Sequence, residues 1–200
     1  MFQYPEAIKN LIKHFSSLPG LGPKTAERLV FYLLNVPKQN LIQFGDELQG
    51  LQDKIKRCQN CQNFSETNPC LICQDKRRNQ KVVCVVARPQ DLLALEKTNE
   101  YQGVYHILSG VIDPLAGITP DQLKIKELIN RIKNNGVYEI ILALNSDLPG
   151  ETTILYLTKI IKQFKNIKIT RLAQGIPTGS DLEYIDEITL SNALRGRKEI

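Results

Sequence analysis

Four cysteines in one short stretch constrain this chain more than any other feature. Cys58, Cys61, Cys70 and Cys73 form two CxxC pairs with eight residues between them. Each pair brings two sulfurs to one point, and together the pairs complete a closed tetrahedral Cys₄ site. We therefore predict one structural Zn²⁺ ion per chain, which supports the fold and takes no part in catalysis.

Two disulfide bonds or a redox-active cysteine pair are the alternatives to zinc. The first six residues show neither the basic nor the apolar part of a secretory signal. We therefore expect a cytoplasmic protein, and disulfides are rare in the cytoplasm. Two CxxC pairs so close together also exceed what redox chemistry needs. A fifth cysteine, Cys84, stands alone in an apolar run, and we expect it to be a small buried core residue.

A glycine turn between two predicted helices is the second informative feature. The segment Leu-Pro-Gly-Leu-Gly-Pro-Lys begins at Leu18, and Gly20 and Gly22 allow a sharp turn and a close approach to another surface. Lys24 and Arg28 are four residues apart, so they project from one face beside a helix N-terminus, which attracts anions. This has the form of a helix-hairpin-helix, which binds DNA phosphates without reading sequence. The alternative is an ordinary corner between helices with two solvated basic residues.

Apolar residues at helical spacing fill the region around this turn. From Ile8 to Phe15 and from Ala26 to Leu34, they recur every three or four residues, as in a helix with one buried stripe. From Leu41 to Ile55 they recur at near-heptad spacing. Residues 1–57 are therefore predicted to form a helical region that contains the hairpin, followed by a small zinc knuckle over residues 58–73.

From residue 81 the pattern changes to short β-type runs that alternate with helical stripes. Strands that are apolar on both faces and separated by helices are typical of a parallel α/β sheet. The fold class we predict is a multi-part α+β chain whose α/β domain has a mainly parallel sheet and is followed by a C-terminal helix. The four predicted strands are Val82–Ala87, Val104–Leu108, Glu139–Leu144 and Ile167–Leu172.

Two acidic residues, Asp147 and Glu151, follow the third predicted strand. Carboxylates at the C-terminal end of a parallel strand can hold Mg²⁺, but phosphoryl chemistry needs several that converge. The first strand ends at Ala87 and Arg88, neither of which is acidic. The alternative is that both carboxylates begin a helix, where negative charge is favourable. We keep them as a candidate face for weak Mg²⁺ or partner binding and assign no catalytic residue.

The net charge of +5 is unevenly distributed. Residues 1–80 hold eleven basic and seven acidic residues, whereas residues 81–200 hold fifteen and fourteen. A basic surplus near the hairpin favours a polyanionic partner, although four zinc-bound thiolates would halve it. The longest apolar runs are much shorter than the ~20 residues of a membrane helix, so we expect no membrane partner.

The order of these motifs resembles the bacterial recombination mediator family RecR over essentially all 200 residues. A hairpin is followed by a Cys₄ knuckle, an α/β unit and a glycine-containing C-terminal segment. Each motif is modest alone, but the ordered set is highly specific. Besides the hairpin and the cysteines, the resemblance rests on Asp91–Glu96, Gly103–Leu108, Leu115–Ile118, Gly150–Thr153, Thr170–Pro177, Thr189–Leu190 and Gly196–Arg197.

The resemblance implies a Toprim domain over residues 81–176 and a C-terminal segment, residues 177–200, that contacts other copies of the chain. It further implies a ring-like dimer or tetramer that clamps gapped, single-stranded or duplex DNA in the cytoplasm, associated with the nucleoid. With RecO, and in some organisms RecF, such proteins help to load RecA onto single-stranded DNA. Lys24 and Arg28 match the hairpin positions that are expected to face the DNA.

The chain departs from the Toprim pattern at the strand ends. Catalytic Toprim domains carry a Glu after the first strand and Asp-x-Asp after the third, where this chain has Ala87 or Arg88 and the triplet Asn145-Ser146-Asp147. We therefore expect a non-enzymatic DNA-binding mediator. Two rival hypotheses are a Mg²⁺-dependent Toprim enzyme that nicks or primes nucleic acid, and an adaptor that reaches DNA only through RecO.

Overall fold

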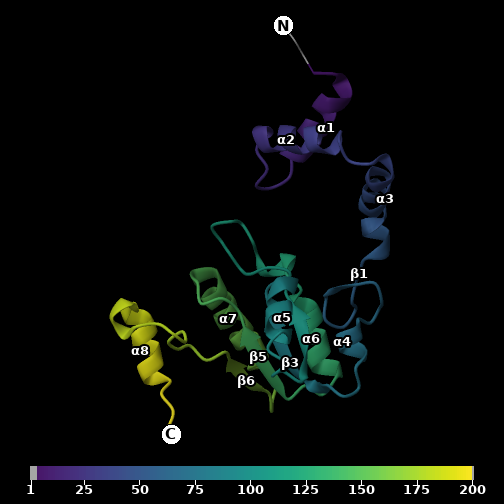
Figure 1. The fold of residues 1–200 in the computed structure, drawn as a ribbon. Helices are drawn as coiled ribbons and strands as arrows, with labels where there is room; N and C mark the ends of the chain where they lie inside the picture. Colours follow the sequence, from purple (N-terminus) through teal and green to yellow (C-terminus); the bar gives the residue numbers. More distant parts are fainter. Residues whose placement is uncertain (1–3, 200) are drawn as a thin grey trace. The chain divides into compact units, whose positions relative to one another are not determined.

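The structure is a computed structural model that describes residues 4–199. The chain forms two compact units, Met1–Lys54 and Ile55–Ile200. Within the described residues, no helix combines the length and the apolar character that crossing a membrane requires. Because the relative placement of the units is not determined, each unit is described by itself (Figure 1).

The first unit consists of helices, and the turn between the first two contains the predicted hairpin. Its apolar side chains are largely exposed: α1 and α3 contain no buried residue, and α2 buries only Ala26 and Val30. The helices confirm the predicted spacing, but the buried stripe expected along α1 is only half-buried. The three helices bury little of each other's apolar surface, and large side chains such as Leu34 and Leu48 remain more than half exposed. The helices are α1 (Glu6–Ser16), α2 (Pro23–Leu33) and α3 (Lys38–Lys54).

Four parallel strands form the central sheet of the second unit, in the order β4-β3-β5-β6. Figure 1 labels β3, β5 and β6 of this sheet. The strands confirm the four predicted runs, and the largest shift is at β3, which begins at Asn79 rather than Val82. The register pairs Val86 of β3 with Ala143 of β5, so these strands end side by side. The strands are β3 (Asn79–Val86), β4 (Gly103–Ile107), β5 (Glu139–Ala143) and β6 (Lys168–Arg171).

Helices cover both faces of this sheet, as a parallel sheet requires. Side chains alternate along β3: Val83 and Val85 join the core beneath α6 and α7, whereas Cys84 and Val86 pack with Leu92 of α5 on the opposite face. Cys84 is buried, as predicted, and burial raises the pKa of its thiol to about 12. The helices are α5 (Pro89–Glu96), α6 (Ile125–Asn134) and α7 (Leu148–Ile161).

The zinc knuckle, residues 55–75, lies against β4 at the edge of the sheet. The Ile107 amide donates to the Cys61 carbonyl (2.8 Å), so the knuckle satisfies a backbone group that an edge strand otherwise leaves unpaired. The buried Arg131 of α6 donates from Nη1 to the carbonyls of Tyr105 (2.6 Å) and Asn60 (3.2 Å), which ties the knuckle to the sheet. The elements of the knuckle are β1 (Lys56–Arg57), β2 (Phe64–Ser65) and α4 (Leu71–Gln74).

The C-terminal segment follows β6 and contains the predicted helix, α8 (Glu187–Arg195), preceded by a 3₁₀ turn, η2 (Leu182–Tyr184). Asp186 caps α8 by accepting from the Thr189 amide (2.9 Å). The helix contains no buried residue, and Ile188 and Tyr184 remain 75% and 82% exposed. The segment therefore presents large apolar side chains that the described chain does not cover.

Candidate nucleic-acid interface and metal centre

The turn between α1 and α2 depends on two glycines with different roles. Gly20 has a φ of +81°, in the left-handed region that glycine adopts without strain. Gly22, the N-cap of α2, has an ordinary φ of −81°, and a Cβ added there would meet no atom within 4 Å. Neither backbone strain nor internal packing therefore requires a glycine at position 22. The missing side chain leaves space in which the surface of another molecule can approach the backbone.

The N-terminus of α2 is open toward solvent. Gly22 offers no capping side chain, Pro23 has no N–H, and the first intrahelical bond is made by the Ala26 amide to the Gly22 carbonyl (2.9 Å). The amides of Lys24 and Thr25 therefore precede the helical ladder, where the helix dipole favours an anion. This is the geometry of a phosphate site at a helix N-terminus.

Lys24 and Arg28 extend this open end along one face of α2. Both side chains are exposed, and neither has an ion-pair partner in the part of the chain that the structure describes. The two cations line a surface groove with Glu27, Phe31, Tyr32 and Asn35. Sequence reasoning missed the aromatic part of this groove, although Tyr32 continues the four-residue spacing from Lys24 through Arg28.

A second groove in the same unit has the opposite chemistry. Its lining is mostly leucine and phenylalanine from all three helices, with Leu34 61%, Leu48 57% and Phe44 44% exposed. Such a patch is typical of a protein contact rather than a nucleic-acid contact. The first unit therefore offers a cationic surface and an apolar surface. The apolar groove is lined by Leu11, Phe15, Leu18, Val30, Leu33, Leu34, Val36, Leu41, Phe44 and Leu48, among others.

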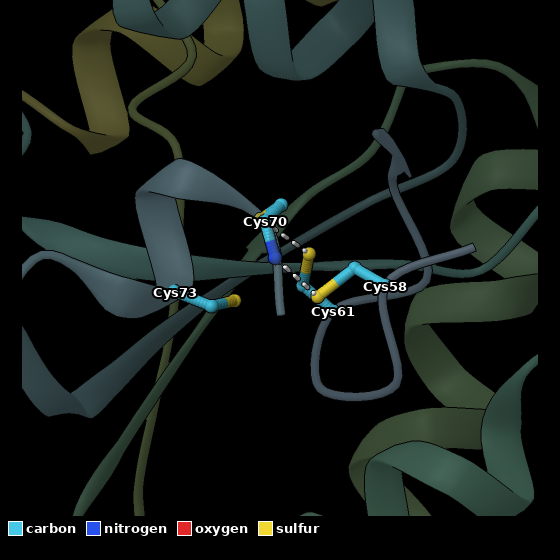
Figure 2. A group of neighbouring side chains, drawn as sticks. All are labelled: Cys58, Cys61, Cys70 and Cys73. Atoms are coloured by element: carbon cyan, nitrogen blue, oxygen red, sulfur yellow. Dashed lines mark hydrogen bonds between the residues drawn. The ribbon is translucent and has the colours of Figure 1, made fainter. Parts of the chain in front are cut away.

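The four predicted metal ligands converge in the second unit (Figure 2). Their sulfurs all lie within 4.8 Å of one another, and all four residues are buried. The Cys61 and Cys70 sulfurs are 3.5 Å apart, much longer than a disulfide bond of about 2.05 Å. The Cys70 amide also donates to the Cys58 sulfur (3.3 Å).

The chemistry of this donor set fits one structural zinc ion. Four thiolate ligands fill every position of a tetrahedral Zn²⁺ site, so no position is open for a substrate. The hydrogen bond with Cys70, together with burial, raises the pKa of the Cys61 thiol to about 12, and contacts with Cys61 and Cys70 raise the pKa of Cys73 well above its usual range. Bound zinc ionises its thiols. Metal binding and folding of the knuckle are therefore coupled.

Family models match four successive parts of the chain. A RecR helix-hairpin-helix model matches residues 8–51, and a RecR zinc finger model of the four-cysteine type matches residues 55–75. A Toprim domain model matches residues 81–173, and a RecR C-terminal model matches residues 175–198. The chain belongs to the RecR family. The predicted resemblance is thereby confirmed, and the zinc finger match agrees with the geometry of the four cysteines.

The Toprim strand ends of this RecR-family chain hold carboxylates that are already engaged. Asp147 is the N-cap of α7, and its Oδ1 accepts from the Gly150 amide (2.8 Å). Glu151, one turn later, forms a bidentate pair with Arg171 at the end of β6, with N···O distances of 2.6 and 3.2 Å. The sequence did not indicate this pair, because the two residues are brought together only by the order of the strands.

The remaining Toprim positions are not acidic. Because Val86 pairs with Ala143 at the ends of β3 and β5, the residues that follow the two strands lie near each other: Ala87 and Arg88 after β3, and Asn145 after β5. Arg88 is exposed, and its amide donates to Asp91 Oδ2 (2.8 Å) at the start of α5. A cation therefore stands close to where catalytic Toprim domains place a metal-binding carboxylate. The strand ends bring no convergent set of free carboxylates together within the described residues.

Proposed function

We propose that this RecR-family chain is a non-enzymatic recombinational DNA repair protein that clamps DNA through its helix-hairpin-helix. The RecR domains support a role in recombinational repair. The observation that carries the proposal is the open N-terminus of α2, where Lys24 and Arg28, which have no ion-pair partner among the described residues, stand beside Gly20 and Gly22. These four residues would bind the phosphate backbone, without reading sequence.

Partners complete the proposed function. We propose that several copies assemble into a ring through the apolar groove of the first unit and the C-terminal segment, residues 177–200, because both expose large apolar side chains. The ring would act in the cytoplasm with RecO, and with RecF where it occurs, to help load RecA onto single-stranded DNA. The engaged carboxylates Asp147 and Glu151 support a role without Mg²⁺-dependent turnover.

The test is a titration of a gapped DNA duplex with the zinc-loaded protein and Mg²⁺, resolved on native and denaturing gels. We expect a salt-sensitive shift with intact strands. The double variant Lys24→Ala/Arg28→Ala should weaken binding at least about tenfold and lower the slope of log affinity against log salt by about two. The matched control Lys159→Ala/Lys162→Ala removes the same charge from exposed positions at the end of α7 and should leave binding unchanged.

Three results would overturn the proposal. Cut or extended strands that depend on Asp147 would restore the Toprim enzyme hypothesis. Binding that appears only after RecO is added would favour the adaptor. Equal losses in the hairpin and control variants would remove the hairpin from the interface, because net charge alone would then explain binding.

A further inference from the structure

The groove on α2 joins its two cations to exposed aromatic rings. Lys24, Arg28 and Tyr32 follow one another at four-residue intervals, and Phe31 lies in the same groove. Residues four apart lie on one helix face, with a rise of about 6 Å between them. The row therefore runs about 12 Å along the helix.

The two aromatic rings in this groove differ in their exposure and in their contacts with the rest of the chain. Phe31 is 38% exposed and contacts the Tyr4 ring edge-on, with ring centroids 5.3 Å apart. Tyr32 is 67% exposed, and within residues 4–199 its hydroxyl has no hydrogen-bond partner and its ring contacts no other aromatic ring. Tyr32 therefore presents an open ring directly beyond the cationic end of the row.

The chemistry of this groove distinguishes its ligand from that of the apolar groove in the same unit. The apolar groove is lined mainly by aliphatic and phenylalanine side chains, whereas this groove places two cations, which have no ion-pair partner within residues 4–199, beside an aromatic ring. Cations that follow the phosphate backbone and rings on which bases stack are the two components of surfaces that bind single-stranded nucleic acid. A duplex offers the phosphates but buries the faces of its bases in the stack.

We infer that Tyr32 is a base-stacking residue, and that the α2 groove takes the single-stranded part of DNA with its phosphates at Lys24 and Arg28 and an unpaired base against Tyr32. This inference rests on the proposed DNA-binding function and deepens it by naming the class of DNA at this site. The hairpin amides and cations bind either form of DNA, and Tyr32 adds the preference for a strand with an exposed base, as at a gap.

The experiment compares full-length, zinc-loaded variants on a thymidine oligonucleotide, on an abasic strand of equal length and on a blunt duplex. Tyr32→Ala should weaken thymidine binding at least about fivefold, the low end of the effect of removing one stacked base. Duplex and abasic binding should be unchanged. Tyr32→Phe keeps the ring and should bind like the unchanged protein. The matched control Tyr156→Ala, at an exposed position on α7, should alter none of the three affinities.

A second measurement reports stacking directly. The chain contains no tryptophan, so Tyr32→Trp introduces a single indole whose fluorescence reports on position 32. The thymidine oligonucleotide should quench this emission, and the abasic strand should not. Sedimentation without DNA should give Tyr32→Ala and the unchanged protein the same mass.

The outcomes separate this inference from the proposed function. If Lys24→Ala weakens all DNA binding but Tyr32→Ala leaves thymidine binding within twofold, the stacking role is wrong and the hairpin interface stands. A change of mass in Tyr32→Ala, or an equal loss on duplex and single strand, would also overturn the inference, and the former would assign the ring to a contact between chains. If the unchanged protein binds none of the DNAs, the proposed function itself fails.

Discussion

The hairpin of the first unit and the strand ends of the Toprim domain both carry charged residues that the sequence indicates as candidate binding groups, but they differ in what those residues contact. Lys24 and Arg28 have no ion-pair partner within residues 4–199, whereas Asp147 caps a helix and Glu151 pairs with Arg171. Groups without internal partners remain available to a ligand. Groups with partners already contribute to folding. The comparison predicts that substitutions in the first class reduce DNA affinity and substitutions in the second reduce stability.

The zinc site has the most internal partners and gives the largest expected effect on stability. Cys70→Ser, or removal of the metal by a chelator, should cost several kcal/mol and unfold the knuckle, because zinc binding supplies its folding energy. The edge of the sheet at β4 should loosen with it, since the Cys61 carbonyl accepts from Ile107. Thermal unfolding with a parallel zinc assay checks this, and Cys84→Ser is a control that removes a thiol outside the site. Full stability of the metal-free chain would contradict it.

The next largest expected effect on stability comes from His106, and it depends on pH. Its side chain is fully buried, its Nε2 contacts the Lys124 carbonyl (2.7 Å), and burial lowers its pKa to about 4. Unfolded histidine titrates near 6.5, so between these values the unfolded chain binds more protons. Stability from this residue is therefore complete above pH ~6.5 and falls by about 3 kcal/mol as the pH drops toward 4.

The measurement for His106 is the free energy of unfolding in urea at a series of pH values. His106→Gln should flatten the difference curve in this window, and the zinc thiolates, common to both proteins, cancel. Parallel curves for the two proteins would show that the histidine does not titrate on unfolding. DNA affinity above pH ~6.5 should be equal in both, as expected for a residue whose partners are internal.

Asp147 tests the acidic side of the comparison directly. Asp147→Ala removes the cap of α7 and should cost about 1 kcal/mol of stability, while Asp147→Asn keeps an acceptor for the Gly150 amide and should cost less. Neither change should alter DNA affinity or the intact state of bound DNA. Chemical denaturation and the gapped-duplex titration measure the two quantities. A loss of DNA affinity without a loss of stability would contradict this, and would show that Asp147 contacts DNA rather than supporting the fold.

Gly22 gives the smallest expected change in stability, and its sign is opposite to the change in binding. Gly22→Ser provides a better N-cap in open space, so stability should rise by a few tenths of a kcal/mol. DNA affinity should fall for two reasons. The serine hydroxyl would accept a hydrogen bond from an amide at the start of α2, and its Cβ would fill the open space beside the glycine. Gly50→Ala, inside α3 and outside the apolar groove, should also stabilise but leave affinity unchanged. Unchanged affinity in Gly22→Ser would show that phosphate does not approach this helix end.

Much of the fold and of the candidate sites follows from local spacing in the sequence. The cysteine pairs, the glycine turn and the alternating apolar runs each lie within a few residues, where helix period, strand period and turn geometry are fixed by the covalent chain. The strand runs were therefore located to within three residues, and the four cysteines converge as predicted. Tyr32 was also within reach of this reasoning, because its four-residue spacing from Arg28 is visible in the sequence.

Only the tertiary structure decided which of these groups have partners. Glu151 meets Arg171 because β5 and β6 are neighbours, and Arg131 meets the carbonyls of Tyr105 and Asn60 because the knuckle lies against β4. Such contacts depend on strand order and packing between distant segments, which no local period encodes. The sequence by itself thus determined the metal site and the hairpin of this RecR-family chain. Packing determined that the carboxylates at the strand ends have internal partners and that Lys24 and Arg28 have no ion-pair partner in the described part of the chain.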